Sequence, residues 1–281
     1  MQEGGDGKMS SRASKPSTAA RGFTLAELSF HAAVRQVRKN HGNAIIGLGV
    51  NIAQTLILVL VFYAMFMLLG FTSRGIRGDF LLFVMTGTFL FMCHVKTMQA
   101  VVGAEGPTSA MMKHAPMNTM VAIGAAALSQ LYIQVLSMVV ILFLYHAIWT
   151  PLEVHDPLGA LLMLMLSWFT GVAIGIVLLG VKPWAPAAVS LIAQIYARVN
   201  MVASGKMFVA SSLPGFLRVY FDWNPLFHTI DQARGFAFLN YSANTTTWTY
   251  PLIITAVALL LGLMGEFFTR RRASLSWGAR V

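Results

Sequence analysis

The sequence predicts an all-α polytopic membrane protein: six transmembrane helices, an amphipathic interfacial helix at the N-terminus and short re-entrant helices before the last span. Hydrophobic residues make up 57% of the 281 residues and charged residues only 11%, whereas an ordinary soluble domain is about one quarter charged. A helix rises ~1.5 Å per residue and the hydrocarbon core is ~30 Å thick, so roughly 20 apolar residues span it. Six stretches reach that length: 44–69, 80–102, 120–148, 158–181, 184–203 and 251–269.

Helices are expected in these stretches because lipid offers the backbone no hydrogen-bond partner. The fifth stretch is the least apolar, since it carries Pro186, Gln194, Arg198 and Asn200. An arrangement of five spans therefore stays open beside the six. The turn at 182–186 holds two prolines, and it predicts an antiparallel hairpin of the fourth and fifth helices.

The N-terminal 43 residues are too polar to enter the membrane. Residues 1–21 are rich in Gly, Ser, Lys and Arg and predict a disordered tail without a cleavable signal peptide. Residues 22–43 combine helically spaced apolar residues with cations beside the first span, which predicts an amphipathic helix at the membrane interface. Its cations at that end are Arg35, Arg38 and Lys39. A plain juxtamembrane linker is the alternative.

The distribution of charge predicts the orientation. Most Lys and Arg residues lie in the N-terminal arm and in the basic tail 270–281, and six spans place both ends on one side. Cytoplasmic segments carry the excess of cations, so we expect both termini in the cytoplasm. The net charge of +10 follows this pattern and does not indicate nucleic-acid binding. The single cysteine, Cys93, excludes a disulfide within the chain.

Residues 204–234 are too long for a simple loop and too mixed to span the membrane. Pro214 and Gly215 break an apolar run there, which predicts short helices that dip into the outer leaflet and return. Asn224 and Pro225 then begin a further short helix, because asparagine caps a helix start and proline suits its first turn.

The chain lacks the motifs of a nucleotide or metal site. Gly205-Lys206 is followed by Met207, so it does not form the phosphate-binding loop G-x-x-x-x-G-K-[ST]. No paired-cysteine or H-E-x-x-H pattern occurs in the sequence. Lys96 and Arg198 fall inside predicted spans, where ionisable groups often line a substrate path. We take them, with Tyr196, as candidate path residues; a structural partner on a neighbouring helix is the alternative for each cation.

Residues 224–234 contain a short pattern that resembles a motif of a known protein family. It reads Asn224-Pro225-Leu226, then His228, and then Asp231 and Arg234 one helical turn apart. With the basic amphipathic helix and the six spans, residues 23–272 resemble the membrane subunit of ABC exporters of the ABC-2 type, in the polysaccharide-exporting branch. His228 makes the pattern more similar to capsule exporters than to O-antigen exporters. Family members more often carry Glu where this chain has Asp231.

The resemblance implies that 44–269 is a permease domain acting as a homodimer on two cytoplasmic ATPase subunits, which hold the ATP and Mg. It implies export of a lipid-linked polysaccharide across the bacterial inner membrane, contact with membrane lipids, and a connection to periplasmic and outer-membrane export components. The loop 103–118 is then the coupling loop, although a simple connector is its alternative. Its candidate coupling residues are Glu105, Pro107, Lys113 and His114.

Residues 204–234 would close the outer mouth, with the family motif as its gate. The gate residues are Pro214, Gly215, Asn224, Pro225, His228, Asp231 and Arg234. Asp231 and Arg234 share a helix face, so a local ion pair and a direct hold on substrate are both open. The other functions left open are an ABC-2 exporter of another lipid or small molecule, and a membrane-embedded assembly factor or enzyme without an ATPase.

Overall fold

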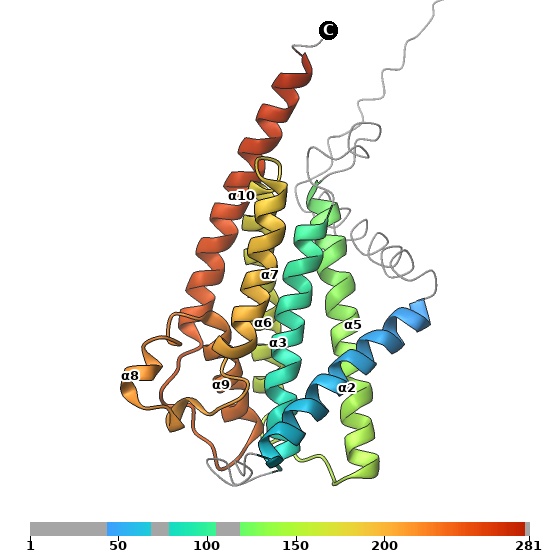
Figure 1. The fold of residues 1–281 in the computed structure, drawn as a ribbon, viewed down its shortest axis with the longest axis vertical. Helices are drawn as coiled ribbons and strands as arrows, with labels where there is room; N and C mark the ends of the chain where they lie inside the picture. Colours follow the sequence, from blue (N-terminus) through green and yellow to red (C-terminus); the bar gives the residue numbers. More distant parts are fainter. Residues whose placement is uncertain (1–43, 69–78, 105–118, 279–281) are drawn as a thin grey trace, which may run out of the picture.

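The computed structural model describes residues 44–68, 79–104 and 119–278, and every regular element in these ranges is helical (Figure 1). The elements are α2 (Ala44–Leu68), α3 (Phe80–Gly103), α5 (Thr119–Ile148), α6 (Pro157–Val181), α7 (Pro186–Ala203), the 3₁₀ turn η1 (Ala210–Ser212), α8 (Gly215–Arg218), α9 (Pro225–Ala237) and α10 (Thr249–Gly278). The predicted tail, the interfacial helix with Arg35, Arg38 and Lys39, and the coupling residues Glu105, Pro107, Lys113 and His114 lie outside the described residues.

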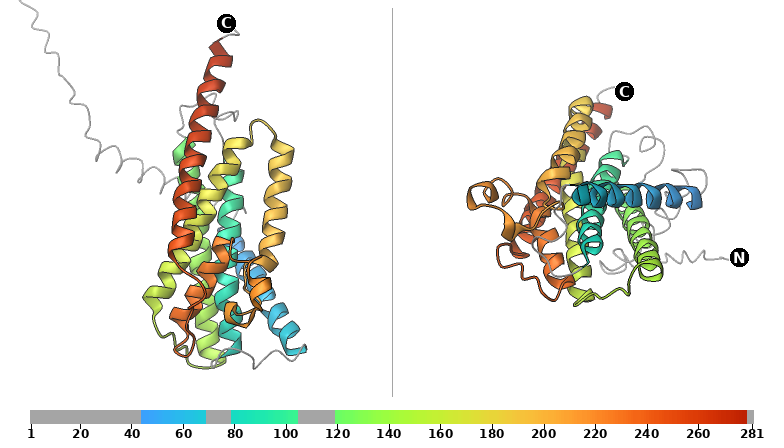
Figure 2. Two further views of the ribbon diagram at one scale, coloured as in Figure 1. Left: turned by 90° about the vertical axis from the view of Figure 1, so that its left-hand side faces the viewer. Right: turned by 60° about the horizontal axis from the view of Figure 1, so that its bottom comes forward.

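Five helices are long and apolar enough to cross a membrane. They cover Ile46–Leu68, Phe80–Gly103, Thr119–Ile148, Pro157–Val181 and Thr249–Thr269. The sixth predicted span corresponds to α7, which is not among the five because Gln194, Arg198 and Asn200 make it more polar. It nevertheless runs antiparallel to α6 along the bundle (Figures 1 and 2). The all-helical membrane class is confirmed, and the sixth span stays a prediction.

The helices alternate in direction, which gives the bundle two distinct ends. One end, which we call the turn end, holds the C-terminus of α3, the α6–α7 turn and the C-terminal part of α10 (Figure 1). The opposite end, which we call the α9 end, holds the α5–α6 connection and residues 204–248 (Figures 1 and 2). The predicted hairpin of the fourth and fifth helices is confirmed.

Helix α3 forms the centre of the bundle. In its apolar window 83% of the residues are buried, against 28% for α2 and 22% for α5 and α10, so the latter three present most of their surface outward. Helix α6 packs on α3 through glycines: a Cβ on Gly171 would lie 2.5 Å from the carbonyl oxygen of His94, and one on Gly175 would lie 2.8 Å from the Cβ of Val101. Small residues four apart allow this close approach of membrane helices.

Side-chain caps begin three of the helices. Asp79 accepts from the backbone N–H of Leu81 at the start of α3, and Asp156 accepts from Gly159 at the start of α6. Asn224 caps α9, and Pro225 occupies the first turn, as the sequence predicts. In the predicted re-entrant stretch the short elements η1 and α8 flank Pro214. Their depth in a membrane stays a prediction.

Candidate functional site

Asn224 joins α9 to the end of α7. Its Oδ1 accepts from the N–H of Leu226 at 3.0 Å, which satisfies one free amide of the new helix. Its Nδ2 donates to Oδ1 of Asn200 at 2.9 Å and to the carbonyl oxygen of Ala203 at 2.8 Å. An aspartate would keep the cap but lose both donations, so the amide fixes where α9 starts relative to α7.

Arg234 binds the loop that follows α7. Its Nη1 donates to the carbonyl oxygens of Gly205 at 2.9 Å and Phe208 at 2.8 Å, and its Nη2 donates to that of Lys206 at 2.7 Å. The guanidinium carbon lies 3.8 Å from the ring centroid of Phe83 on α3. Burial lowers the pKa of Arg234 to about 10, so the side chain remains charged near neutral pH. One buried cation thus holds residues 205–208 against α9 and α3.

The backbone of this loop needs a glycine. Gly205 has φ +70°, and a Cβ there would lie 2.5 Å from Cδ2 of Phe227. A left-handed turn at this position costs an ordinary residue conformational energy, and the contact with Phe227 adds a clash. The turn lets the carbonyl groups of Gly205, Lys206 and Phe208 converge on Arg234.

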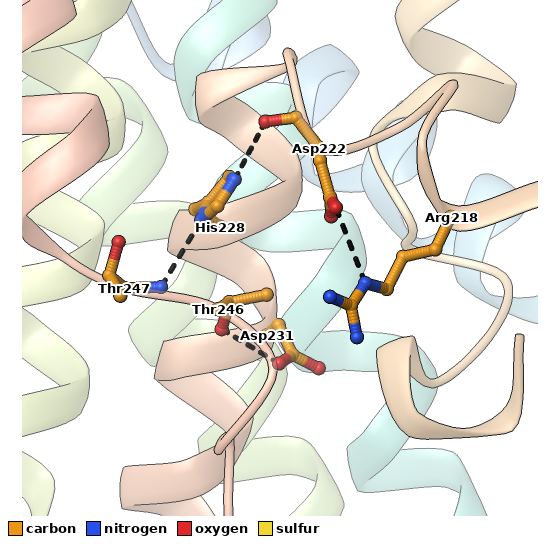
Figure 3. A network of polar contacts seen from close by, with 6 residues as sticks. All are labelled: Arg218, Asp222, His228, Asp231, Thr246 and Thr247. Carbon is orange, nitrogen blue, oxygen red and sulfur yellow. Dashed lines mark hydrogen bonds and ion pairs between the residues drawn. The ribbon is translucent and has the colours of Figure 1, made fainter. Parts of the chain in front are cut away.

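Asp231 faces a different segment. Its Oδ2 accepts from the hydroxyl of Thr246 at 2.8 Å (Figure 3). Its Oδ1 accepts from the hydroxyl of Tyr241 at 2.5 Å, and the residue is buried. Burial and the neighbouring Asp231 raise the pKa of Tyr241, which therefore stays a hydrogen-bond donor. Among the described residues the structure contains no ion pair between Asp231 and Arg234. The local pair considered from their spacing is wrong, because each side chain has closer tertiary partners.

His228 bridges two loops at the α9 end. The N–H of Thr247 donates to Nδ1 at 3.2 Å, so Nε2 carries the hydrogen and donates to the carbonyl oxygen of Asp222 at 2.8 Å (Figure 3). Asp222 also forms a half-buried ion pair with Arg218 on α8, with 3.3 Å between Oδ2 and Nε (Figure 3). Pro214 and Gly215 are exposed and lie outside the network.

Lys206 is a site residue that no sequence motif predicted. Gly205-Lys206 was considered only as part of a phosphate-binding loop, whose motif it does not complete. The residue is 2% exposed. Its Nζ lies 3.7 Å from the ring centroid of Phe91 and 4.4 Å from that of Phe62, without a hydrogen-bond partner. A desolvated cation–π contact stabilises by about 2 kcal/mol, whereas removing an ammonium from water costs several kcal/mol. Burial accordingly lowers the pKa of this amine to about 7.

The family model that describes the ABC-2 type transporter matches residues 29–238, which is most of the chain. The chain belongs to the ABC-2 type transporter family. Members are the transmembrane transport subunits of ABC transporters, which normally dimerise and work with ATPase subunits. The comparison with curated proteins found no match.

The three candidate path residues of this ABC-2 permease do not form one cluster. Lys96 on α3 donates to Oε1 of Gln54 on α2 at 3.0 Å. Arg198 lies exposed on α7. The hydroxyl of Tyr196 lies 2.9 Å from Nε2 of His94, whose Nδ1 lies 2.9 Å from Oγ1 of Thr170. Tyr196 therefore helps to join α7 to α3 and α6. For Lys96, the hydrogen bond to Gln54 supports the alternative in which a neighbouring helix supplies a structural partner.

The permease also carries an ionisable residue that the sequence analysis overlooked. Glu266 lies within the α10 span and is 4% exposed, and its Oε1 has no hydrogen-bond partner. A Cβ on Gly180 would lie 3.4 Å from the backbone nitrogen of Glu266, so this carboxylate sits where α10 crosses α6 near the turn end. An ionisable residue within the apolar stretch 251–269 is visible in the sequence, so Glu266 could have been found there.

Proposed function

We propose that this chain is the permease subunit of an ATP-driven exporter that moves a lipid-linked polysaccharide, of the capsular kind, across the bacterial inner membrane. It acts as a homodimer on two cytoplasmic ATPase subunits that hold ATP and Mg, with its own termini in the cytoplasm. The family match supports the transport role. The cargo rests on the pattern from Asn224 to Arg234.

One observation carries the proposal: the residues of that pattern hydrogen-bond several separate segments to α9. Asn224 holds α7, His228 holds residues 222 and 247, Asp231 holds residues 241 and 246, and Arg234 holds residues 205–208. Because these hydrogen bonds connect the segments through one short helix, the segments would move together. This is what a gate that seals and opens the outer end requires. A direct hold on substrate by Asp231 or Arg234 is less favoured, because both side chains are already engaged.

The opposite end of the permease would receive the ATPase motion. In this proposal Glu105, Pro107, Lys113 and His114 contact the ATPase subunits, and Arg35, Arg38 and Lys39 lie among lipid head groups. Cations at that level favour anionic lipids and the phosphate groups of a lipid-linked cargo.

The test is reconstitution. The chain is co-expressed with a candidate ABC ATPase subunit, purified, and placed in proteoliposomes with lipid-linked capsular polysaccharide. We expect a stoichiometric complex and ATP-dependent movement of the glycan across the bilayer, abolished by an inactive ATPase.

Two results would contradict the proposal in different ways. A complex whose ATP hydrolysis responds to another lipid or small molecule, and not to the glycan lipid, would establish an exporter with different cargo. A homo-oligomer that never retains the ATPase would favour an assembly factor or an enzyme.

A further inference from the structure

Lys206 occupies a slot with one fixed side and one side that is less firmly held. Phe91 on α3 and Phe62 on α2 form its walls, at 3.7 and 4.4 Å from Nζ. The α3 side is fixed, because a Cβ on Gly87 would lie 2.7 Å from Nη2 of Arg234 and 2.9 Å from the Cβ of Lys206. Backbone and side chain are already in close contact there, and Arg234 holds the carbonyl group of Lys206.

The α2 wall is the one that no polar contact ties to the slot. Helix α2 buries only 28% of its apolar window, and it crosses the bundle obliquely over α3 and α5 (Figures 1 and 2). Its side-chain hydrogen bonds to other helices involve Gln54 with Lys96, and Asn51 with Ser137 and Gln134. All of these lie at least two helical turns before Phe62 along α2. Among the described residues, the half of α2 that covers Lys206 makes apolar and aromatic contacts and no side-chain hydrogen bond to another helix: Val59, Phe62 and Phe66 are buried, and Phe66 packs edge-on against Phe80 of α3.

The amine has no acceptor in this packing. Its Nζ is buried and makes no hydrogen bond. The charged and titratable groups on α9 and α3 are engaged elsewhere: Arg234 with three carbonyl groups, Asp231 with Tyr241 and Thr246, Lys96 with Gln54, and His94 with Tyr196. An ammonium here lacks both water and a counter-ion, whereas a neutral amine fits between two aromatic rings.

We propose that Lys206 is a charge switch for the packing of α2 on α3. The neutral amine favours the closed slot, and the ammonium favours an arrangement in which the Phe62 half of α2 has moved away and water reaches Nζ. The inference does not rest on the cargo or on the ATPase. It would make the α9 end of the permease responsive to proton concentration.

The pH window follows from the two environments. In the closed slot the pKa of the amine is about 7, and in water it is near its ordinary value of 10.5. Over this interval the open arrangement binds more protons than the closed one, so the closed slot loses stability as pH falls from about 10.5 to about 7. Below about pH 7 the amine is protonated in both arrangements, and the equilibrium between them no longer changes with pH.

The experiment measures the position of α2 by pulsed electron paramagnetic resonance. Spin labels are placed at Val61 on α2 and Phe169 on α6, both exposed, in the full chain with Cys93→Ala. The protein is held in lipid nanodiscs and diluted with unlabelled chain. A matched pair at Phe169 and Val257 on α10 serves as control, because neither helix bears on the slot.

With Lys206 present, we expect the Val61–Phe169 pair to show a longer distance whose population falls several-fold between about pH 7.5 and about pH 9.5. Lys206→Met should give the short distance at both values, and Lys206→Arg, which stays charged, the longer one at both. The control pair should not change. The same pH response in Lys206→Met, or one distance distribution for all three proteins, would overturn the proposal.

A further variant keeps the test decisive if a Lys206 variant does not fold. Phe62→Leu retains the amine but removes one aromatic wall, so it should increase the longer population at both pH values. Monodisperse elution in detergent checks its fold. A Phe62→Leu distribution identical to that of the unaltered protein would also overturn the proposal.

Discussion

Arg234 is the residue on which the α9 end depends most. Replacing it with methionine keeps the length but removes the donor to the carbonyl groups of Lys206 and Phe208, while that of Gly205 still accepts from the N–H of Phe208 at 3.3 Å. Since each buried unpaired group costs roughly 1–3 kcal/mol, we expect Arg234→Met to lower the free energy of unfolding by about 3 kcal/mol or more. Reversible unfolding in detergent measures this free energy.

Arg218→Gln is the control for this variant. It removes the half-buried ion pair with Asp222, so it should lower the free energy of unfolding by only about 0.5 kcal/mol. Equal losses in the two variants would refute the role assigned to Arg234.

Charge exchange at Asp231 and Arg234 tests whether these residues act as a pair. The double change Asp231→Arg with Arg234→Asp would restore an ion pair but not the separate partners of each side chain, Tyr241 and Thr246 on one side and residues 205–208 on the other. We therefore expect no rescue of export or stability relative to either single change. Recovery in the double variant would show that pairing matters after all.

At the scale of elements, the contact of α6 with α3 depends on Gly171. Its added Cβ would meet the His94 carbonyl oxygen at 2.5 Å, so Gly171→Ala should force the helices apart and destabilise the bundle by about 1–3 kcal/mol. A Cβ on Gly49 of α2 has no atom within 4 Å. Gly49→Ala should thus be neutral or stabilise by up to about 1 kcal/mol. Thermal unfolding of both variants checks this, and a stable Gly171→Ala would contradict the packing argument.

At the scale of the whole molecule, the open question is whether α7 crosses the membrane. If it does, Ala185 in the α6–α7 turn and Asn240 in the connection from α9 to α10 lie on opposite sides of the membrane. In a Cys93→Ala background, we expect an impermeant maleimide to label Asn240→Cys in intact cells and Ala185→Cys only after permeabilisation. Labelling of both from the same side would establish five spans.

Much of the α9 end was predictable as local structure, and the family resemblance singled out its residues, but the partners of those residues were not predictable. The cap at Asn224 follows from residue type and spacing. The partners of His228, Asp231 and Arg234 lie up to 29 residues away along the chain. Helical spacing placed Asp231 beside Arg234, but it contains no information on the backbone carbonyl groups that bind Arg234 in the folded chain.

The sequence by itself determined the class of the protein, the positions of its long helices, the α6–α7 hairpin and the start of α9. These properties follow from the length of apolar runs and from proline and asparagine at helix ends, which act within a few residues. The tertiary structure alone decided that Lys206 is buried between Phe62 and Phe91, that Arg234 clamps residues 205–208, and that Lys96, Tyr196 and Arg198 stay apart. Burial and hydrogen-bond partners depend on which helices meet, and local patterns do not encode that.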